Sequence, residues 1–503
     1  MSGSQTITID GRSLTLDALR AVANGTSRVV LDDAARDRMQ ASRGVVNAIV
    51  ASGAAVYGVT TGFGKMSDVR IPADKLAELQ INLVRSHVTG VGPLLPKREV
   101  RAMMVLRANV LAAGYSGARA ALAELLLGML NADLWPAVPE QGSVGASGDL
   151  APLAHLALSL IGEGDLFVGD HSMPAAKALA AAGLKPVTLE SKEGLALING
   201  TQAHAGVTAL AVGDALILWG TAQVAGAATL DALLGTPAAF DERIHAARGQ
   251  VGQLEAAAGL RALGEGSAIR ESHRTGDPRV QDAYALRCMP QVHGPALDAI
   301  RFCEGLLARE INAATDNPLV FADGTLLSGG NFHGQAGAMA ADFLAIALTN
   351  LVTMSERRID RLVNPDLNEG LPAFLAHERG LHSGYMMAQV AAAALASECK
   401  VLCHPASVDT IPTDGGKEDV VPMAMGAAIK LRRVVQNVSN VIAIELMCAA
   451  QGLEFRRPLR SSARIEEAVT RVRRLVPRLE ADRVIAGDIA ALANAVSLGT
   501  FLV

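Results

Sequence analysis

The stretch QGSVGASGDL at residues 141–150 is the part of the sequence around which the rest is organised. Its three glycines make backbone conformations accessible that residues with a side chain resist. Prolines at positions 136 and 139 stop a preceding helix from continuing, and Pro152 suits the first turn of a new helix that we expect to start at Asp149. On these grounds alone the stretch predicts a tight loop that leads into a helix, with Ser147 as an ordinary hydroxyl.

Upstream of this loop, most segments have the spacing of helices. Residues 101–133 form one helical stretch that breaks near residues 114–117. Residues 6–15 instead look like a short hairpin, because isoleucines alternate there and an Asp-Gly turn signal follows them.

Downstream of the loop, the sequence predicts a series of long helices. Short alternating pieces at residues 165–168 and 185–189 come first and are candidate strands. We expect the helices at residues 201–234, 295–314, 335–364, 383–402, 421–450 and 465–475.

The composition agrees with a helical protein. Half of the residues are hydrophobic but only 3% are aromatic, so the apolar mass includes much Ala, Leu and Met, which favour helices. Segments rich in Ala and Gly, such as residues 386–396, allow helices to pack closely at the centre of a bundle. We expect a mainly α fold in one continuous unit, with a loop-rich N-terminal portion at residues 1–200 and a long central helical bundle with C-terminal helices at residues 201–503.

Charge and composition argue against several classes of partner. A net charge of −5 over 503 residues disfavours nucleic acid. The longest apolar run, residues 215–230, is interrupted by polar residues, and we expect it to be a buried helix that is too short and too polar to span a membrane. The N-terminus lacks the pattern of a signal peptide, and five cysteines suit a reducing cytoplasm.

A metal site is also not expected. Cys399 and Cys403 lie four residues apart and are followed by His404, but no further ligands appear at a definite spacing. We expect these cysteines to be buried helical thiols.

The tripeptide Ala146-Ser147-Gly148 also allows a specific chemistry. In a tightly bent loop, the Gly148 nitrogen can attack the carbonyl carbon of Ala146, where glycine leaves the attacking nitrogen least hindered. Loss of water closes a five-membered ring, and loss of the Ser147 hydroxyl leaves an exocyclic methylene. The product, 4-methylidene-imidazol-5-one (MIO), is an electrophile that needs no external cofactor, and backbone strain would favour its closure.

Several motifs together resemble the aromatic amino acid lyases, which are the histidine, phenylalanine and tyrosine ammonia-lyases with related aminomutases. The resemblance covers nearly the whole chain. Its stretches are YGVTTGFG at 57–64, GSVGASGDLAPL at 142–153, NGT at 199–201, VQDAY at 280–284 with Arg287, NAATDNP at 312–318 and GGNFHG at 329–334.

The resemblance implies a fold, a prosthetic group and an assembly. The fold is of the fumarase/aspartase-like superfamily, although the Gly-Ser loop motif of the fumarase-type proteins, GSxxMPxKxN, is absent here. The group is MIO, formed from Ala146, Ser147 and Gly148. The assembly is a homotetramer with active sites shared between subunits, and the substrate is a small amino acid.

The resemblance also implies roles for individual residues. Tyr57 is the base that takes the β-proton of the substrate, and because a free tyrosine has a pKa of about 10, we expect nearby positive charge to favour its phenolate. Tyr284 and Gln281 lie around the amine and the electrophile, and Arg287 binds the substrate carboxylate in a bidentate geometry. Asn199 bonds the region of the prosthetic group and carboxylate, and Phe332 packs on the ring.

Two places in the sequence bear on the substrate. Ser86 and His87 match the Ser-His pair typical of histidine lyases, and an imidazole at residue 87 can bond a substrate imidazole. Glu418, in KEDVVPM at 417–423, is a second candidate because a carboxylate accepts from an imidazole N–H. Histidine lyases usually read QEDHVSM there, so this stretch is a hybrid, and Lys417 could pair with Glu418.

The sequence therefore predicts an ammonia-lyase that converts L-histidine to urocanate in histidine degradation. The alternatives are a lyase for tyrosine or a modified histidine, an aminomutase that returns the ammonia to the β-carbon, and a non-catalytic helical scaffold. A scaffold has no need of Tyr57, Ser147, Asn199, Tyr284 and Arg287 together.

Overall fold

The computed structural model describes residues 5–503, which divide into two compact units. Unit 1 consists of Met1–Gly213, Glu304–Asp342 and Pro405–Ile429. Unit 2 consists of Asp214–Cys303, Phe343–His404 and Lys430–Val503. The chain passes between them within four long helices, α9 (Gln202–Ala232), α14 (Met289–Glu310), α15 (Gln335–Val363) and α17 (Ala424–Phe455), and once between His404 and Pro405.

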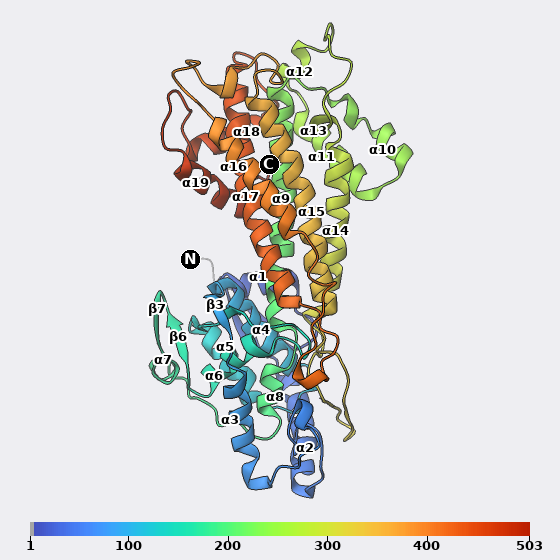
Figure 1. Ribbon diagram of the computed structural model, residues 1–503, viewed down its shortest axis with the longest axis vertical. Coiled ribbons are helices and arrows are strands. Elements are labelled where there is room, and N and C mark those ends of the chain that lie inside the picture. Colours follow the sequence, from blue (N-terminus) through green and yellow to red (C-terminus); the bar gives the residue numbers. More distant parts are fainter. Residues whose placement is uncertain (1–4) are drawn as a thin grey trace. The chain divides into compact units, whose positions relative to one another are not determined.

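Unit 1 combines short helices with small sheets (Figure 1). Its other helices are α1 (Leu16–Ala23), α2 (Asp33–Ser52), η1 (Gly64–Met66), η2 (Ala73–Lys75), α3 (Leu76–His87), α4 (Lys97–Ala112), α5 (Ala120–Asn131), α6 (Leu150–Leu160), α7 (Ala175–Ala181), α8 (Glu193–Ile198) and η5 (Asp414–Gly416). Its strands are β1 (Gln5–Ile9), β2 (Ser27–Leu31), β3 (Val91–Leu94), β4 (Leu134–Pro136), β5 (Pro139–Gln141), β6 (Asp165–Val168), β7 (His171–Pro174), β8 (Leu319–Val320) and β9 (Leu326–Leu327). They pair as β1 with β2, β3 with β5, β4-β6-β7, and β8 with β9.

Unit 2 is helical throughout its described part. Besides its shares of the long helices, it contains η3 (Pro237–Phe240), α10 (Glu242–Arg248), α11 (Val251–Gly264), α12 (Ala268–Ser272), α13 (Tyr284–Arg287), η4 (Ala373–Leu375), α16 (Met386–Leu402), α18 (Ala463–Leu475) and α19 (Ala486–Ser497). The mainly α fold class predicted from the sequence is confirmed.

The predicted hairpin near the N-terminus is wrong. β1 pairs in parallel with β2, in the register Ile7 to Val29, and α1 connects the two strands. Asp10 accepts hydrogen bonds from the backbone N–H groups of Arg12 and Ser13, so the Asp-Gly signal marks a turn that leads into α1.

The helix predictions agree with the structure except at some ends. The break expected near residues 114–117 separates α4 from α5. Helix α14 starts at Met289 and not at residue 295, so Pro295 lies inside it. Proline leaves the carbonyl four residues earlier without its helical donor but does not end the helix here. The expected strand at 165–168 is present as β6, whereas residues 185–189 form none and β6 pairs with β7.

The core of unit 2 explains why small residues recur in its helices. A Cβ atom added at Gly452 of α17 would lie 3.1 Å from the Cβ of Ala232 on α9. The same core holds a fully buried ion pair, in which Arg358 of α15 donates to Glu445 of α17 at 2.5 and 2.9 Å. Thr229 of α9 donates to the same carboxylate at 2.9 Å, so the three helices are joined by polar contacts as well as by packing.

The sequence predicts that the apolar run at 215–230 is too short to span a membrane, but the helix that contains it is longer than the run. The run belongs to the 31-residue helix α9, and α9, α15 and α17 are each long and apolar enough to cross a membrane by length and composition. Their most apolar windows are 67%, 61% and 83% buried inside the protein. Burial among other side chains therefore accounts for their apolar character.

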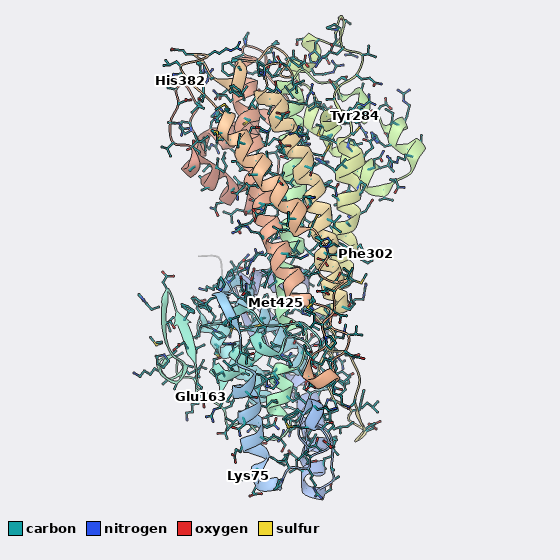
Figure 2. All side chains as sticks on the ribbon, in the orientation of Figure 1. Lys75, Glu163, Tyr284, Phe302, His382 and Met425 are labelled. Atoms are coloured by element: carbon teal, nitrogen blue, oxygen red, sulfur yellow. The ribbon has the colours of Figure 1, made fainter. Side chains whose placement is uncertain are left out.

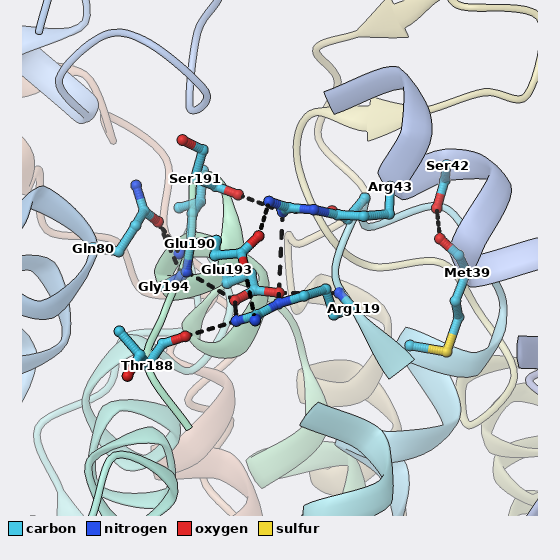
Figure 3. A network of polar contacts seen from close by, with 12 residues as sticks. Met39, Ser42, Arg43, Gln80, Arg119, Thr188, Glu190, Ser191, Glu193 and Gly194 are labelled. Atoms are coloured by element: carbon cyan, nitrogen blue, oxygen red, sulfur yellow. Dashed lines mark hydrogen bonds and ion pairs between the residues drawn. The ribbon is translucent and has the colours of Figure 1, made fainter. Parts of the chain in front are cut away.

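A buried network of charges holds the start of α8 in unit 1. Glu193, fully buried, accepts from the Arg119 guanidinium at 2.6 and 2.8 Å, and Figure 3 shows it next to Arg43. Gln80 of α3 accepts from the Gly194 N–H at 2.9 Å. Because α8 ends at Ile198, these contacts fix the point at which Asn199 leaves the helix.

Candidate active site

A cavity of about 340 Å³ in unit 1 brings together several of the predicted site residues. It is lined by Tyr57, Ala146, Ser147, Phe332 and Glu418. These residues come from three of the sequence motifs and from the hybrid stretch, which lie up to 361 residues apart in the chain. The cavity is also lined by Lys417, and by His333 and Asp414, for which the sequence alone suggested no role.

The loop that carries Ala146, Ser147 and Gly148 is held against the end of α8. Gly148 forms a parallel bridge with Gly200, and the Asp149 N–H donates to the Gly200 carbonyl at 2.7 Å. Gly148 has a φ of +73°, and a Cβ atom there would lie 2.1 Å from the Gly200 oxygen. No residue with a side chain fits at this position, for reasons of both space and backbone conformation.

Asn199 fixes the middle of the tripeptide. Its side-chain amide donates to the carbonyl oxygen of Ser147 at 2.9 Å. Its own Oδ1 is buried and has no hydrogen-bond partner among the described residues. Such an acceptor calls for a donor from outside the described contacts, because an unpaired buried polar atom is costly.

Glu418 binds two hydroxyl groups at the cavity. Ser147 Oγ and Thr413 Oγ1 donate to its two different oxygen atoms. The two hydroxyls, and not Lys417, therefore occupy the carboxylate in this structure. Loss of the Ser147 hydroxyl would leave one oxygen of Glu418 able to accept from another donor.

Tyr57 lies half-buried at the cavity, in an environment that disfavours its ionised form. Burial raises the pKa of its phenol, the Gly64 backbone N–H opposes this, and the carboxylates of Asp414, Asp316 and Glu418 raise the pKa further. Unit 1 thus supplies negative charge around Tyr57, contrary to the positive charge expected from the sequence. A group that favours the Tyr57 phenolate has to be one other than these three carboxylates.

His87 ends α3 and is not among the described residues that line the cavity. Its Nδ1 lies 2.8 Å from the Leu83 carbonyl one turn earlier. A carbonyl can only accept, so Nδ1 donates, and Nε2 is the ring nitrogen left for another partner. His87 therefore bonds a backbone carbonyl in the last turn of α3.

Gln281, Tyr284 and Arg287 belong to unit 2 and are not among the lining residues of this cavity. Tyr284, labelled in Figure 2, is 70% exposed at the surface of its unit. The Arg287 guanidinium carbon lies 4.9 Å from the centre of the Tyr284 ring. Both side chains are accessible to a molecule outside unit 2.

Comparison with known proteins identifies the family. The sequence model described as aromatic amino acid lyase matches residues 14–474. The chain belongs to the aromatic amino acid lyase family. It is a carbon–nitrogen lyase, as the sequence motifs predicted.

Relatives of this lyase extend over its whole length. The histidine ammonia-lyase of Anaeromyxobacter dehalogenans (strain 2CP-C) is 55% identical, covering 98% of this chain and 99% of the relative. The crystal structure of histidine ammonia-lyase from Trypanosoma cruzi is similar with a TM-score of 0.92 and 44% identity, covering 99% of this chain and 94% of that chain. A tyrosine aminomutase from Streptomyces globisporus has a TM-score of 0.94 and 39% identity, covering 99% and 98%.

Asp149, in the lyase loop, binds a helix other than the one that directly follows it. Asp149 precedes α6 but makes no capping bond to it. Its carboxylate instead accepts from the backbone N–H groups of Ala203 and His204 at 3.0 and 2.9 Å, in the first turn of α9. Only the tertiary fold places the start of α9 beside Asp149.

No group of three or more His, Cys, Asp or Glu side chains within residues 5–503 could hold a metal ion. Cys399 lies buried within α16 and Cys403 follows its last turn.

The charges around Tyr57 can be tested by titration. Asp414→Asn should lower the pKa of Tyr57, because it removes the largest of the carboxylate charges that raise it. The measurement is the ultraviolet absorbance of ionised tyrosine against pH, with the Tyr57→Phe protein subtracted to remove the three other tyrosines. Asp419→Asn is the control, because Asp419 lines the cavity but does not contribute to the shift. An unchanged Tyr57 titration in Asp414→Asn would contradict the assignment.

Proposed function

We propose that this lyase eliminates ammonia from L-histidine to give urocanate, at the cavity that contains Ser147, with an MIO group made from Ala146, Ser147 and Gly148. The observation that carries the proposal is the tripeptide itself, held at the cavity by Asn199 and Glu418. The relatives named histidine ammonia-lyase, at 50–55% identity over the full length, support the same substrate.

The residues present fit such a ring. The pairing of Gly148 with Gly200 bends the loop at the residue whose nitrogen must reach the Ala146 carbonyl. Ala146, whose carbonyl carbon must be reached, is a buried residue of the cavity wall. The unpartnered Oδ1 of Asn199 leaves an acceptor beside the tripeptide for a substrate or ring donor. When formed, the ring supplies an electrophilic methylidene carbon to which an amine adds.

The side chains at the cavity then bind substrate and move protons. Tyr57 takes the β-proton, and Phe332 packs on the ring. Because the carboxylates near Tyr57 raise its pKa, the phenolate requires a cation beside it. Arg287, which binds the substrate carboxylate in this proposal, and the substrate ammonium are cations that can serve.

Recognition of imidazole is assigned to His87 and Glu418. Nε2 of His87 is free of the capping bond, and one oxygen of Glu418 loses its donor when Ser147 is dehydrated. These groups would bond imidazole nitrogens and would be left unpaired beside a phenyl ring.

The active sites are completed by other subunits in a homotetramer, where Gln281, Tyr284 and Arg287 reach the cavity of a neighbour. Exposed apolar side chains on the helices of unit 2 support self-association: Phe302, labelled in Figure 2, is 56% exposed, and Phe343, Ile346, Met387 and Val390 are also exposed.

Light scattering of the active protein should give the mass of four chains, and an active monomer would contradict the proposal.

The five cysteines, all free, suit the reducing cytoplasm proposed for this enzyme.

An aminomutase is the second candidate, because the fold is shared with a tyrosine aminomutase. Urocanate absorbs in the near ultraviolet and a β-amino acid does not, so analysis of the product separates the two.

The prosthetic group predicts a defined mass. The peptide that spans residues 146–148 should be lighter than its sequence by two waters in active protein. Ser147→Ala should abolish turnover and leave the fold intact, because only a loop hydroxyl changes. Full peptide mass in active wild-type protein would exclude this mechanism.

The substrate prediction rests on polar pairing. L-Histidine should be turned over far faster than L-tyrosine or L-phenylalanine, because sites that reject substrates lacking the expected hydrogen bonds discriminate by roughly 10⁴. His87→Leu and Glu418→Gln should each lower kcat/KM for histidine. A panel of histidine, tyrosine, phenylalanine and ring-methylated histidine gives the answer, and tyrosine equal to histidine would refute the assignment of His87.

A further inference from the structure

The two ends of the loop that carries the tripeptide are joined to each other. Ser143, before the tripeptide, donates through Oγ to Asp149 Oδ1 at 3.1 Å. The same Oγ accepts from the Gly145 N–H at 3.2 Å. The side chains of Ser143 and Asp149 thus close a small ring of contacts across residues 146–148.

The far side of Asp149 is anchored on a histidine. His204 Nδ1 lies 2.8 Å from Asp149 Oδ2, and both side chains are fully buried. The same oxygen accepts from the backbone of Ala203 and His204, so it is fixed to the first turn of α9. The carboxylate therefore connects α9 to Ser143 through its two different oxygens.

This arrangement favours the charged form of both partners. Burial alone would raise the pKa of Asp149, but the charge and hydrogen bonds of His204 outweigh it, and the pKa is lowered. Burial alone would lower the pKa of His204, but Asp149 outweighs it, helped by Glu310, and the pKa is raised. Because removing one partner of such a buried pair leaves an uncompensated charge, Asp149 and His204 stabilise each other only while both are in place.

The surroundings make specific room for the histidine ring. Cβ atoms added at Gly334 and Gly337 would each lie 2.6 Å from His204 ring atoms. His204 Nε2 is buried and has no partner within the described part of the chain. A second contact ties this region to the loop, since the Gly334 N–H donates to the Gly145 carbonyl at 3.0 Å.

We propose that Ser143 and His204 are positioning residues for ring formation, which act through Asp149 to hold residues 146–148 in the bent conformation that closes. This inference rests on the proposed MIO group. In the first step a bond forms between the Gly148 nitrogen and the Ala146 carbonyl carbon. The Ala146 carbonyl oxygen leaves as water, with one hydrogen from the Gly148 nitrogen and one from the Ser147 nitrogen. In the second step the Ser147 hydroxyl leaves as water with the Ser147 α-hydrogen. Neither step requires an oxidant.

The contacts of Ser143 and His204 with Asp149, called here the Ser143–Asp149–His204 clasp, join the loop ends. This clasp matters for the first step because ring closure needs the Gly148 nitrogen and the Ala146 carbonyl carbon at bonding distance. Without the Ser143–Asp149 bond, the loop can relax and lose this approach. Neither Ser143 nor His204 lines the cavity, so they are not expected to bind substrate.

The test is the mass of the peptide containing residues 146–148, measured for wild type, Ser143→Ala, His204→Phe and their conservative counterparts. In Ser143→Ala and His204→Phe we expect most chains to keep the full peptide mass. Turnover should fall in proportion to the fraction of chains that have lost two waters, and KM should be unchanged. Ser143→Thr and His204→Gln keep a donor to Asp149 and should restore the loss of two waters in most chains. Thr208→Ala is the matched control, because Thr208 is buried one turn along α9 and bonds only the His204 carbonyl.

The outcomes separate this inference from the proposed function. Full peptide mass in the wild type would refute the prosthetic group itself. A wild type lacking two waters, with Ser143→Ala and His204→Phe lacking them equally, would overturn the positioning role. The same holds if those variants contain the ring but show a raised KM, since that indicates substrate binding. If His204→Phe does not fold, Ser143→Ala decides, because its side chain lies only partly buried in the loop.

Discussion

The pairing of Gly148 with Gly200 is the contact on which the candidate site depends. A Cβ atom at Gly148 would lie 2.1 Å from the backbone oxygen of Gly200, and a Cβ atom at Gly200 would lie 2.3 Å from the Arg107 guanidinium. Gly200 follows Asn199 at the end of α8, and α9 starts at Gln202. The same bridge therefore sets the bend of the loop and places Asn199 against the Ser147 carbonyl.

Buried charged side chains bind both ends of α8, next to the bridge. Arg107, fully buried, donates to the carbonyls of Ala196 and Asn199, and burial lowers its pKa to about 10. Lys192 pairs with Asp316 at 2.8 Å, with both side chains buried. Removing a partner from such a pair would leave a charge without compensation. Arg107 thus holds the end of α8, and the Lys192 pair anchors the residue before its start.

The electrostatics of unit 1 show what the site lacks. Three carboxylates raise the pKa of Tyr57, and the buried amide oxygen of Asn199 has no partner among the described residues. Both features call for cations or donors, and the partly exposed Arg287 is one such group. These carboxylates disfavour the Tyr57 phenolate, and a cation beside Tyr57, such as Arg287 of another subunit in the proposed assembly, would favour it.

The sequence by itself determined the helical class, most of the long helices, the lyase family and the tripeptide, because helical periodicity and contiguous motifs are local properties. It also indicated Glu418 through a stretch only a few residues long. Tertiary structure decided the parallel pairing of β1 with β2, the helix that Asp149 caps, and the Ser143–Asp149–His204 clasp. Each of these joins residues that are neighbours only after folding, and His204 gave no signal because a lone histidine in an apolar helix has the same local pattern whether it packs or pairs.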